Sequence, residues 1–213
     1  MIITIDGPAG SGKSTVAKLL AKRLNVRFLD TGAMYRAVAL AVLQGGARES
    51  DAEAVAEIAG KVEIGFDNET VLLNGVGVTS EIRTPEVTAI SSVVAANPAV
   101  RTRLVELQRS VGRQGSLVTE GRDQGSVVFP GAEFKFFVPA SVDARARRRH
   151  RELTVSGSSL TLATVRTQLQ QRDARDENRQ HAPMKPADDA VILDTSDMSI
   201  AQVVETVATM VEE

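Results

Sequence analysis

GPAGSGKS, residues 7–14, directly follows the apolar run IITI of residues 2–5. The run predicts a buried strand, and G-x-x-x-x-G-K-S between a strand and a helix is the pattern of a loop that binds nucleoside triphosphates. The glycines let the backbone curl with its N–H groups pointing inward, and the positive end of the next helix points at the same anion. Lys13 is expected to reach the outer phosphates and the Ser14 hydroxyl to ligate Mg²⁺. The expected ATP-binding residues are Gly7, Pro8, Ala9, Gly10, Ser11, Gly12, Lys13, Ser14 and Thr15.

Composition narrows the class of protein. An apolar content of 43% over 213 residues is typical of a globular protein with a substantial core, and a net charge of −2 argues against a general nucleic-acid binder. The absence of cysteine excludes disulfides and thiolate metal sites. We find neither a signal sequence nor an apolar run that spans a bilayer, so we expect a cytoplasmic protein without a membrane partner. No exposed apolar seam stands out, which favours a monomer.

Short apolar runs alternate with helical patterns at both ends of the chain. The predicted strands are residues 2–6, 27–29, 117–120, 134–138 and 191–193. Because their apolar residues do not strictly alternate, they suit a parallel sheet that is covered on both faces. Asn97 is expected to cap a helix that begins at Pro98, and Ser199 to cap the last helix. The helix after the phosphate-binding loop is expected to bury a stripe of Val16, Leu19, Leu20 and Leu24. These features predict a doubly wound α/β core.

Two insertions interrupt this alternation. Residues 50–53 read as a capping box, with Ser50 first, that opens a short helix ending near residue 60. Alternating apolar residues from 62 to 78, a polar turn at 67–69 and Asn74-Gly75 predict antiparallel hairpins. The second insertion, residues 145–179, is helical and rich in arginine, and its break at 156–159 suits a mobile lid.

The remaining question is which group receives the phosphoryl group. A GTPase would carry a guanine-selecting N-K-x-D segment, and the chain has none. Arg36 and Arg122 instead follow predicted core strands, where ligands of open α/β sheets bind, and Arg172, Arg175 and Arg179 recur along the second lid helix. The planar fork of arginine bridges phosphate oxygens and keeps its charge.

No general base is evident near these arginines, although an alcohol acceptor would benefit from one. A phosphate acceptor needs none, because its second pKa is about 6 and it is mostly dianionic at neutral pH. The enzyme then has to neutralise and align two anions, which is a task for arginines and Mg²⁺. The composition of the site therefore favours a phosphate as acceptor.

Several longer motifs extend the pattern: LDTGAMYRAVAL, SEIRTPEV, EGRDQGSVVFP, FKFFVPAS and RDARDENR. Together with GPAGSGKST they resemble the bacterial cytidylate kinases over essentially the whole chain. The resemblance implies a P-loop kinase core with a five-stranded parallel sheet, an NMP-binding lobe with a small antiparallel β-insert, and a helical lid. The implied core consists of residues 1–31, 101–144 and 180–213. Residues 32–100 form the implied lobe, and residues 145–179 form the implied lid.

The resemblance also implies roles for single residues. Arg36, Arg122 and Arg179 match the arginines that hold the phosphate of CMP. Ser92, Arg101 and Asp123 match the residues that read cytosine, Arg172 and Asp176 match those that meet the ribose, and Thr31 stands where many relatives carry serine. Lys13, Arg122 and Arg179 are then the catalytic residues. A carboxylate at Asp123 accepts from the N4 amino group of cytosine and faces a carbonyl in uracil, which disfavours UMP.

The implied reaction is transfer of phosphate from ATP to CMP, and also to dCMP, with Mg²⁺. Two alternatives stay open: a kinase of the same fold with another acceptor, and a module whose bound nucleotide controls a partner protein. The arginines at 145–151 form either a solvated helix face or contacts to ATP, with Arg148 the candidate for contact. Glu120 either binds Mg²⁺ through water or pairs with an arginine, and the role of Arg175 stays undecided.

Overall fold

The computed structural model describes residues 1–67, 70–155 and 157–212. These residues form two units: Met1–Leu29 together with Gln114–Glu213, and Asp30–Arg113. In the part of the chain that is described, no helix is long and apolar enough to cross a membrane.

The first unit is built on a five-stranded parallel sheet with the strand order β2-β6-β1-β7-β8. Its strands are β1 (Ile2–Asp6), β2 (Arg27–Asp30), β6 (Leu117–Gly121), β7 (Phe134–Phe137) and β8 (Val191–Ile192). In the centre, Asp6 of β1 lies opposite Gly121 on one side and Phe137 on the other. The carboxyl ends of β1, β6 and β7 therefore share one edge, where the phosphate-binding loop begins. The predicted α/β core is confirmed, with each strand boundary within one residue of the prediction.

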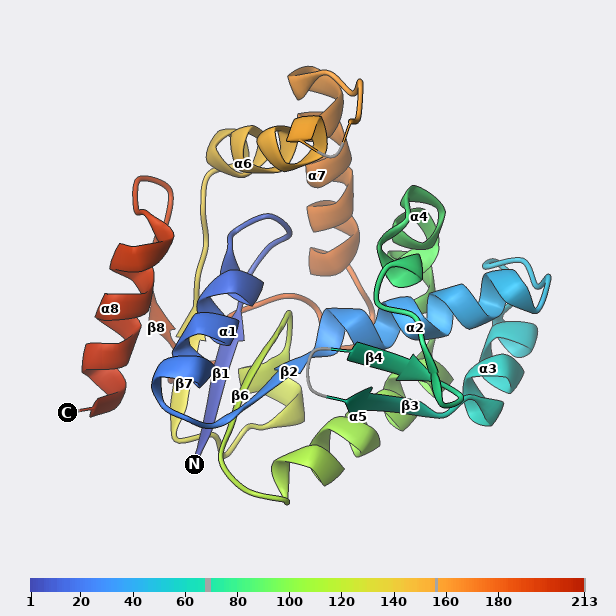
Figure 1. Ribbon diagram of the computed structural model, residues 1–213, viewed down its shortest axis with the longest axis horizontal. Coiled ribbons are helices and arrows are strands. Elements are labelled where there is room, and N and C mark those ends of the chain that lie inside the picture. The colour runs from blue at the N-terminus through green and yellow to red at the C-terminus, as the bar shows by residue number, and fades with distance from the viewer. Residues whose placement is uncertain (68–69, 156, 213) are drawn as a thin grey trace. The chain divides into compact units, whose positions relative to one another are not determined.

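Two helices pack against this sheet, α1 (Lys13–Arg23) and α8 (Ile200–Glu212), and Figure 1 shows them side by side. Ile3 and Ile5 of β1 are fully buried against both helices. The predicted stripe of α1 is correct for Val16 and Leu20 but wrong for Leu19, which is 42% exposed. The buried stripe runs through residues 16, 17, 20 and 21, and Leu19 points away from it.

The arginine-rich insertion forms two packed helices, α6 (Val142–Val155) and α7 (Leu162–Glu177), above the phosphate-binding loop in Figure 1. Ala146, Val165 and Leu169 of these helices form a small apolar cluster that includes Ala9 of the loop. The insertion is therefore in direct contact with the loop.

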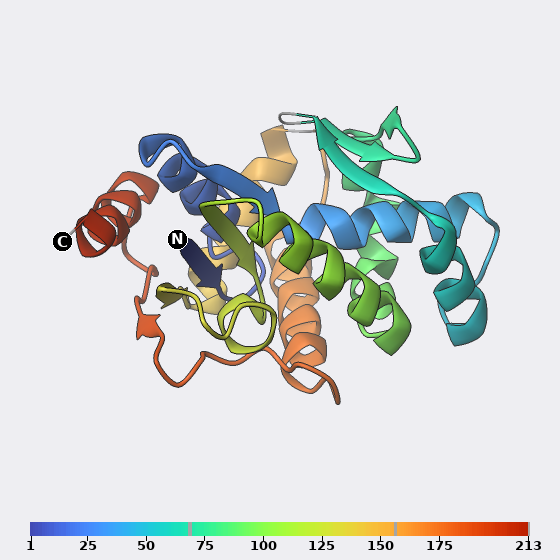
Figure 2. The same ribbon diagram turned by 90° about the horizontal axis from the view of Figure 1, so that it is seen from below.

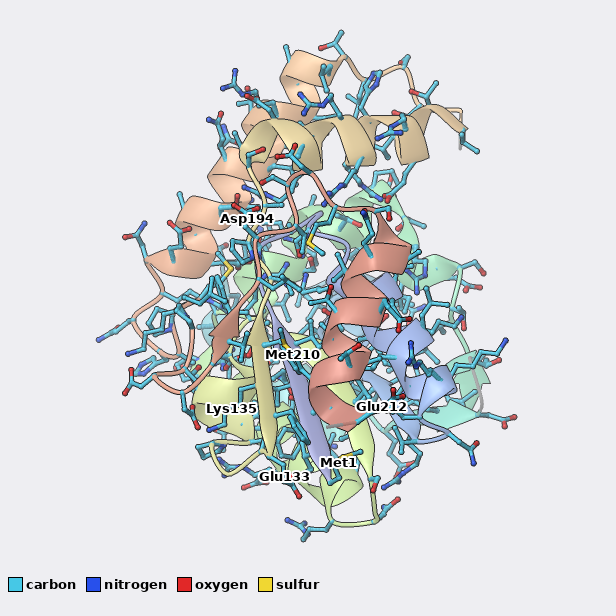
Figure 3. The ribbon with its side chains drawn as sticks, turned by 90° about the vertical axis from the view of Figure 1, so that its left-hand side faces the viewer. Met1, Glu133, Lys135, Asp194, Met210 and Glu212 are labelled. Atoms are coloured by element: carbon cyan, nitrogen blue, oxygen red, sulfur yellow. The ribbon has the colours of Figure 1, made fainter. Side chains whose placement is uncertain are left out.

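The opposite end of the sheet is held by ion pairs. The ammonium group of Met1 lies 3.6 Å from Glu133, and Lys135 Nζ lies 2.7 Å from Asp189; Met1, Glu133 and Lys135 are labelled in Figure 3. β8 forms the outer edge of the sheet, as Figure 2 shows from below.

The second unit combines four helices with a three-stranded antiparallel sheet among its described residues. The elements are α2 (Thr31–Gln44), α3 (Ala52–Lys61), β3 (Ile64–Asp67), β4 (Thr70–Leu73), β5 (Val76–Gly77), α4 (Pro85–Val94) and α5 (Pro98–Gly112), with a 3₁₀ turn at Glu81–Arg83. Asn74 and Gly75 both have positive φ and connect β4 to β5, as the hairpin prediction requires. Of the predicted polar turn at 67–69, residues 68 and 69 lie outside the described residues.

The predicted helix caps are correct at two of three helices. The Asn97 side chain accepts from Ala99 N and Val100 N, and Ser199 Oγ accepts from Gln202 N at 3.3 Å. At α3 the prediction is wrong by one residue: Asp51, not Ser50, caps the helix by accepting from Ala54 N at 3.0 Å. Adjacent serine and aspartate are both good capping residues, so the sequence alone did not distinguish them.

The second unit extends to Arg113, and α5 packs on α2 and α3 within it. The division into core segments, a lobe at 32–100 and a lid at 145–179 stays a prediction.

Candidate active site

The phosphate-binding loop has the backbone that its sequence requires. Gly7 and Gly10 have φ of +154° and +76°, and a Cβ on Gly7 would lie 2.6 Å from Val138 O, so this position accepts only glycine. Gly12, with φ of +91°, begins α1 without a side-chain cap among the described residues. The first N–H groups of α1 are therefore available to an anion.

Lys13 is buried at the start of α1, and its charge is held by one carboxylate. Its Nζ donates to Pro8 O at 3.2 Å and lies 3.7 Å from Glu120 Oε2 at the end of β6. Burial and the nearby positive charge of Arg122 lower the pKa of Lys13 to about 8, although Glu120 opposes the shift. Glu120 thus pairs with this lysine, a partner that the sequence had not indicated.

A second cluster of charges surrounds Asp176 on α7. Arg122 Nε lies 2.8 Å from Asp176 Oδ2, and Arg179 Nη2 lies 4.0 Å from Asp176 Oδ1. Burial opposes the ionised form of Asp176, but the charges of Arg122, Arg179 and Arg172 outweigh it and lower the pKa of this carboxyl. Burial likewise opposes the charge of Arg122, but Asp176 and Glu120 outweigh it and raise its pKa. The cluster therefore stays ionised at neutral pH.

Four cationic side chains, Lys13, Arg122, Arg172 and Arg179, meet the carboxylates of Glu120, Asp176 and Asp173 in this part of the first unit. Lys13 interacts electrostatically with Arg122, Arg172, Glu120 and Asp176, which makes the two clusters one network. Three of the predicted residues on α7 or just after it belong to this network: Arg172, Asp176 and Arg179. A network that gathers four cationic side chains can interact with an anionic ligand.

The loop that carries Arg122 and Asp123 is attached to β1 through Asp6. Asp6 Oδ1 accepts from Gln124 N at 2.9 Å, and Asp6 Oδ2 accepts from Gly125 N at 2.8 Å. Burial raises the pKa of Asp6 to about 7; the two N–H groups oppose the rise, and the charges of Asp123 and Glu120 add to it. Asp123 itself is 3% exposed.

Two arginines of α6 are not on a solvated face. Arg145 is buried, lies 2.6 Å from Asp173 and donates to Ala9 O at 3.0 Å. Arg148 donates to Ser11 O at 3.2 Å and to the carbonyls of Thr195, Ser196 and Met198. Both guanidinium groups therefore fix the backbone of the phosphate-binding loop.

In the second unit, two arginines share one carboxylate. Asp30 caps α2 by accepting from Ala33 N at 2.7 Å, and Arg36 Nη2 and Arg83 Nη2 lie 3.4 Å and 3.7 Å from Asp30 Oδ2. Thr31, the first residue of α2, is buried beside this cap.

The remaining predicted residues of the second unit lie on two other helices. Ser92 on α4 and Arg101 on α5 are both buried, and Arg101 Nη1 donates to Tyr35 Oη at 3.4 Å. Tyr35 of α2 and Arg101 of α5 therefore make a polar contact within the second unit.

Comparison with known proteins identifies the family. The family model described as cytidylate kinase matches residues 3–213. A cytidylate kinase of Citrifermentans bemidjiense is 47% identical over 217 residues, which cover 100% of this chain and 93% of the relative. A cytidylate kinase of Mycobacterium leprae is 46% identical over 214 residues, covering 100% of this chain and 96% of the relative. The chain belongs to the cytidylate kinase family.

Cytidylate kinases of this kind also occur joined to another enzyme. A bifunctional pantoate ligase/cytidylate kinase of Synechococcus is 45% identical over 209 residues, which are 95% of this chain and 39% of that protein. Among solved structures, an uncharacterized protein from Eubacterium ventriosum covers 100% of this chain at 12% identity with a TM-score of 0.52, a likeness that concerns the fold alone.

Sequence reasoning about this cytidylate kinase family member missed three polar residues near its predicted site residues. Asp6 was assigned only to a strand, Arg83 was noted only within the motif SEIRTPEV, and Arg145 was left between two interpretations. Asp6 carried one signal, since a carboxylate that ends a buried strand needs donors from elsewhere. Nothing in the sequence distinguished Arg83 or Arg145 from other surface arginines.

Proposed function

We propose that the protein transfers the γ-phosphoryl group of ATP to the phosphate of CMP and so forms CDP and ADP. One observation carries the proposal: Lys13, Arg122, Arg172 and Arg179 gather in one charge network with the carboxylates of Glu120, Asp176 and Asp173, in a chain of the cytidylate kinase family. The network is matched to a reaction in which two phosphate groups must approach each other.

The donor is held by the phosphate-binding loop. Its N–H groups and the start of α1 receive the phosphates of ATP, and Lys13 neutralises the outer ones. Because the pKa of Lys13 is about 8, the lysine is mostly charged at neutral pH. Arg145 and Arg148 support this role by fixing the carbonyls of Ala9 and Ser11, so that the loop keeps one shape.

The residues present fit a magnesium ion that arrives with the nucleotide. The described residues contain no cluster of three His, Cys, Asp or Glu side chains that would hold a metal alone. Mg²⁺ in kinases uses few protein ligands and is shared with the phosphates. Ser14 is exposed at the start of α1 and offers one hydroxyl oxygen, and Glu120 offers a carboxylate. When bound, the ion neutralises charge on the outer phosphates.

The residues proposed to bind the acceptor are the CMP-binding residues that the family resemblance implies. In the first unit these are Arg122, Asp123, Arg172, Asp176 and Arg179, and in the second they are Thr31, Arg36, Ser92 and Arg101. Arg122 and Arg179 now share Asp176, and Arg36 shares Asp30, so each guanidinium group is already oriented by a carboxylate. Such orientation lowers the entropy lost when a phosphate binds.

Transfer needs no proton removal. An oxygen of the dianionic CMP phosphate attacks the γ-phosphorus, the bond from that phosphorus to the bridging oxygen breaks, and ADP leaves. Arg122 and Arg179 neutralise the acceptor while Lys13 neutralises the donor, which reduces the repulsion between the two anions. We include dCMP as a substrate, and we propose a cytoplasmic monomer without a nucleic-acid partner.

A coupled assay of ADP release tests the proposal. ATP and Mg²⁺ are supplied with CMP, dCMP, UMP, dTMP or no acceptor. We expect rapid release with CMP and dCMP, and slow release otherwise. Rapid release with UMP or dTMP alone would identify a kinase of the same fold for another acceptor. Slow hydrolysis that no acceptor changes would favour the module that acts on a partner protein.

A further inference from the structure

We infer that Asp6 is a positioning residue for the cytosine-reading carboxylate Asp123. The inference rests on the proposed function, because it assigns a support to a residue that is proposed to read the base. Asp6 is not among the residues proposed to contact ATP or CMP. It acts by fixing the backbone that follows Asp123.

The geometry joins two loops through one side chain. Asp6 ends β1, directly before Gly7 of the phosphate-binding loop, and its backbone lies opposite Gly121 of β6. Its two carboxylate oxygens accept from the first two N–H groups after Asp123, those of Gln124 and Gly125, at 2.9 and 2.8 Å. The residue directly before the phosphate-binding loop therefore also fixes the backbone of residues 124–125, which we call the acceptor loop.

The close approach of the acceptor loop to β1 depends on Gly125. A Cβ at this position would lie 2.9 Å from Thr4 Oγ1 and 3.3 Å from the side chain of Lys135. The loop is therefore pressed against β1, and the carboxylate of Asp6 supplies the hydrogen bonds that hold it there. Gln124 also links the loop to β6, since its Oε1 accepts from Thr119 Oγ1 at 3.0 Å.

The position of Asp6 destabilises an ionised carboxylate, so a purely structural contact does not account for an aspartate there. Asp6 is 4% exposed and has no ion pair to a cation among the described residues, while Glu120 and Asp123 place like charges near it. These surroundings disfavour the ionised form, in keeping with the raised pKa of Asp6. However, only the carboxylate has an acceptor oxygen for each of two N–H groups; asparagine has one oxygen and turns an NH₂ group toward the other donor.

The test compares Asp6→Asn with a matched control, Asp51→Asn. Asp51 also accepts from a backbone N–H, but at the start of α3, where asparagine caps equally well. The measurement is kcat/KM for CMP and for UMP, with urea unfolding at pH 8 to show that each variant folds. We expect Asp6→Asn to lower the CMP-to-UMP ratio about tenfold while it still unfolds in one cooperative transition, and Asp51→Asn to leave the ratio unchanged.

A double-mutant comparison separates positioning from an independent effect. If Asp6 acts through Asp123, the ratio of Asp6→Asn/Asp123→Asn equals that of Asp123→Asn alone. Gly125→Ala disturbs the same contact without changing Asp6, so it is expected to lower the ratio as well. If Asp6→Asn does not fold, the CMP-to-UMP ratio of Gly125→Ala tests the inference instead.

The inference is overturned if Asp6→Asn, or Gly125→Ala in its place, keeps the wild-type ratio, or if the two single effects multiply in the double variant. An unchanged ratio in Asp123→Asn would remove the base reader and the inference with it, while leaving the wild-type CMP activity in place. Failure of the wild type to release ADP with CMP would instead overturn the proposed function.

Discussion

The two units orient their arginines in different ways. In the first unit, Arg122 and Arg179 share the buried Asp176, with side chains that are 16% and 8% exposed. In the second unit, Arg36 and Arg83 share Asp30, but the Arg83 side chain is 59% exposed. The first network is therefore screened less by solvent than the second.

This difference separates two tasks. A charge network away from water interacts strongly with a transferring phosphoryl group, because the effective dielectric is low. The partly exposed arginines at Asp30, the N-cap of α2, interact more weakly with an anion. They are better suited to binding the substrate than to stabilising a transition state. We therefore expect substitutions in the first unit to lower kcat, and those in the second to raise KM for CMP.

The largest loss of activity is expected for Lys13→Ala. The change removes the cation that faces the outer phosphates and leaves Glu120 without its lysine. We expect kcat to fall about 1,000-fold or more, with the fold retained by circular dichroism. Steady-state kinetics with saturating ATP and CMP measure the effect, and a loss confined to KM would contradict the role given to Lys13.

The second largest loss of activity is expected for Arg122→Ala, whose kcat should be about 100-fold to 1,000-fold lower than that of the wild type. It removes the guanidinium group that lies 2.8 Å from Asp176 and carries a charge in the same network as Lys13. Asp176→Asn is a useful comparison, since it loosens Arg122 without removing it and should cost less. Near-normal turnover of Arg122→Ala with CMP would show that this arginine does not hold the acceptor phosphate.

Much of this arrangement follows from local sequence patterns. The phosphate-binding loop, the strand β1 and the cap at Asn97 each depend on a few adjacent residues, so they were predictable. Pairing between β1 and the loop after Asp123 joins residues 118 positions apart, which no local pattern encodes. The role of Asp6 was therefore visible only in the folded chain.

The run of arginines in α6 did not indicate which of them are buried. The sequence could not say that Arg145 is buried while Arg147 two positions later is exposed, because both fit either face of a helix. The helical phase was set by the apolar contacts of Ala146 with Ala9 and α7. The family resemblance, not the helical pattern, supplied the residue roles.

The stability of the first unit is expected to depend on pH through Asp6. Its pKa is about 7 in the folded protein and 3.8 in the unfolded chain, so the folded state binds more protons between these values. The contribution of Asp6 to stability therefore falls as the pH rises from about 4 to about 7 and levels off above.

Asp6→Asn removes this titration. Relative to the variant, the wild type is expected to lose about 3 kcal/mol of unfolding free energy between pH 5 and pH 8. Urea denaturation of both proteins at the two pH values measures the difference, and the other groups facing Asp6, Glu120 and Asp123, are present in both. Parallel pH dependences of the two proteins would exclude Asp6 as the titrating group.

The smallest effects are expected in the second unit. Arg36→Ala should raise KM for CMP about tenfold, because Arg36 is the less exposed partner of Asp30, and Arg83→Ala should raise it about threefold or less. KM for ATP should not change in either variant, and both increases should shrink in high salt because the charges are partly screened. If Arg83→Ala raises KM for CMP as much as Arg36→Ala does, both guanidinium groups of the second unit bind the ligand equally. The two units would then differ only in how deeply their arginines are buried.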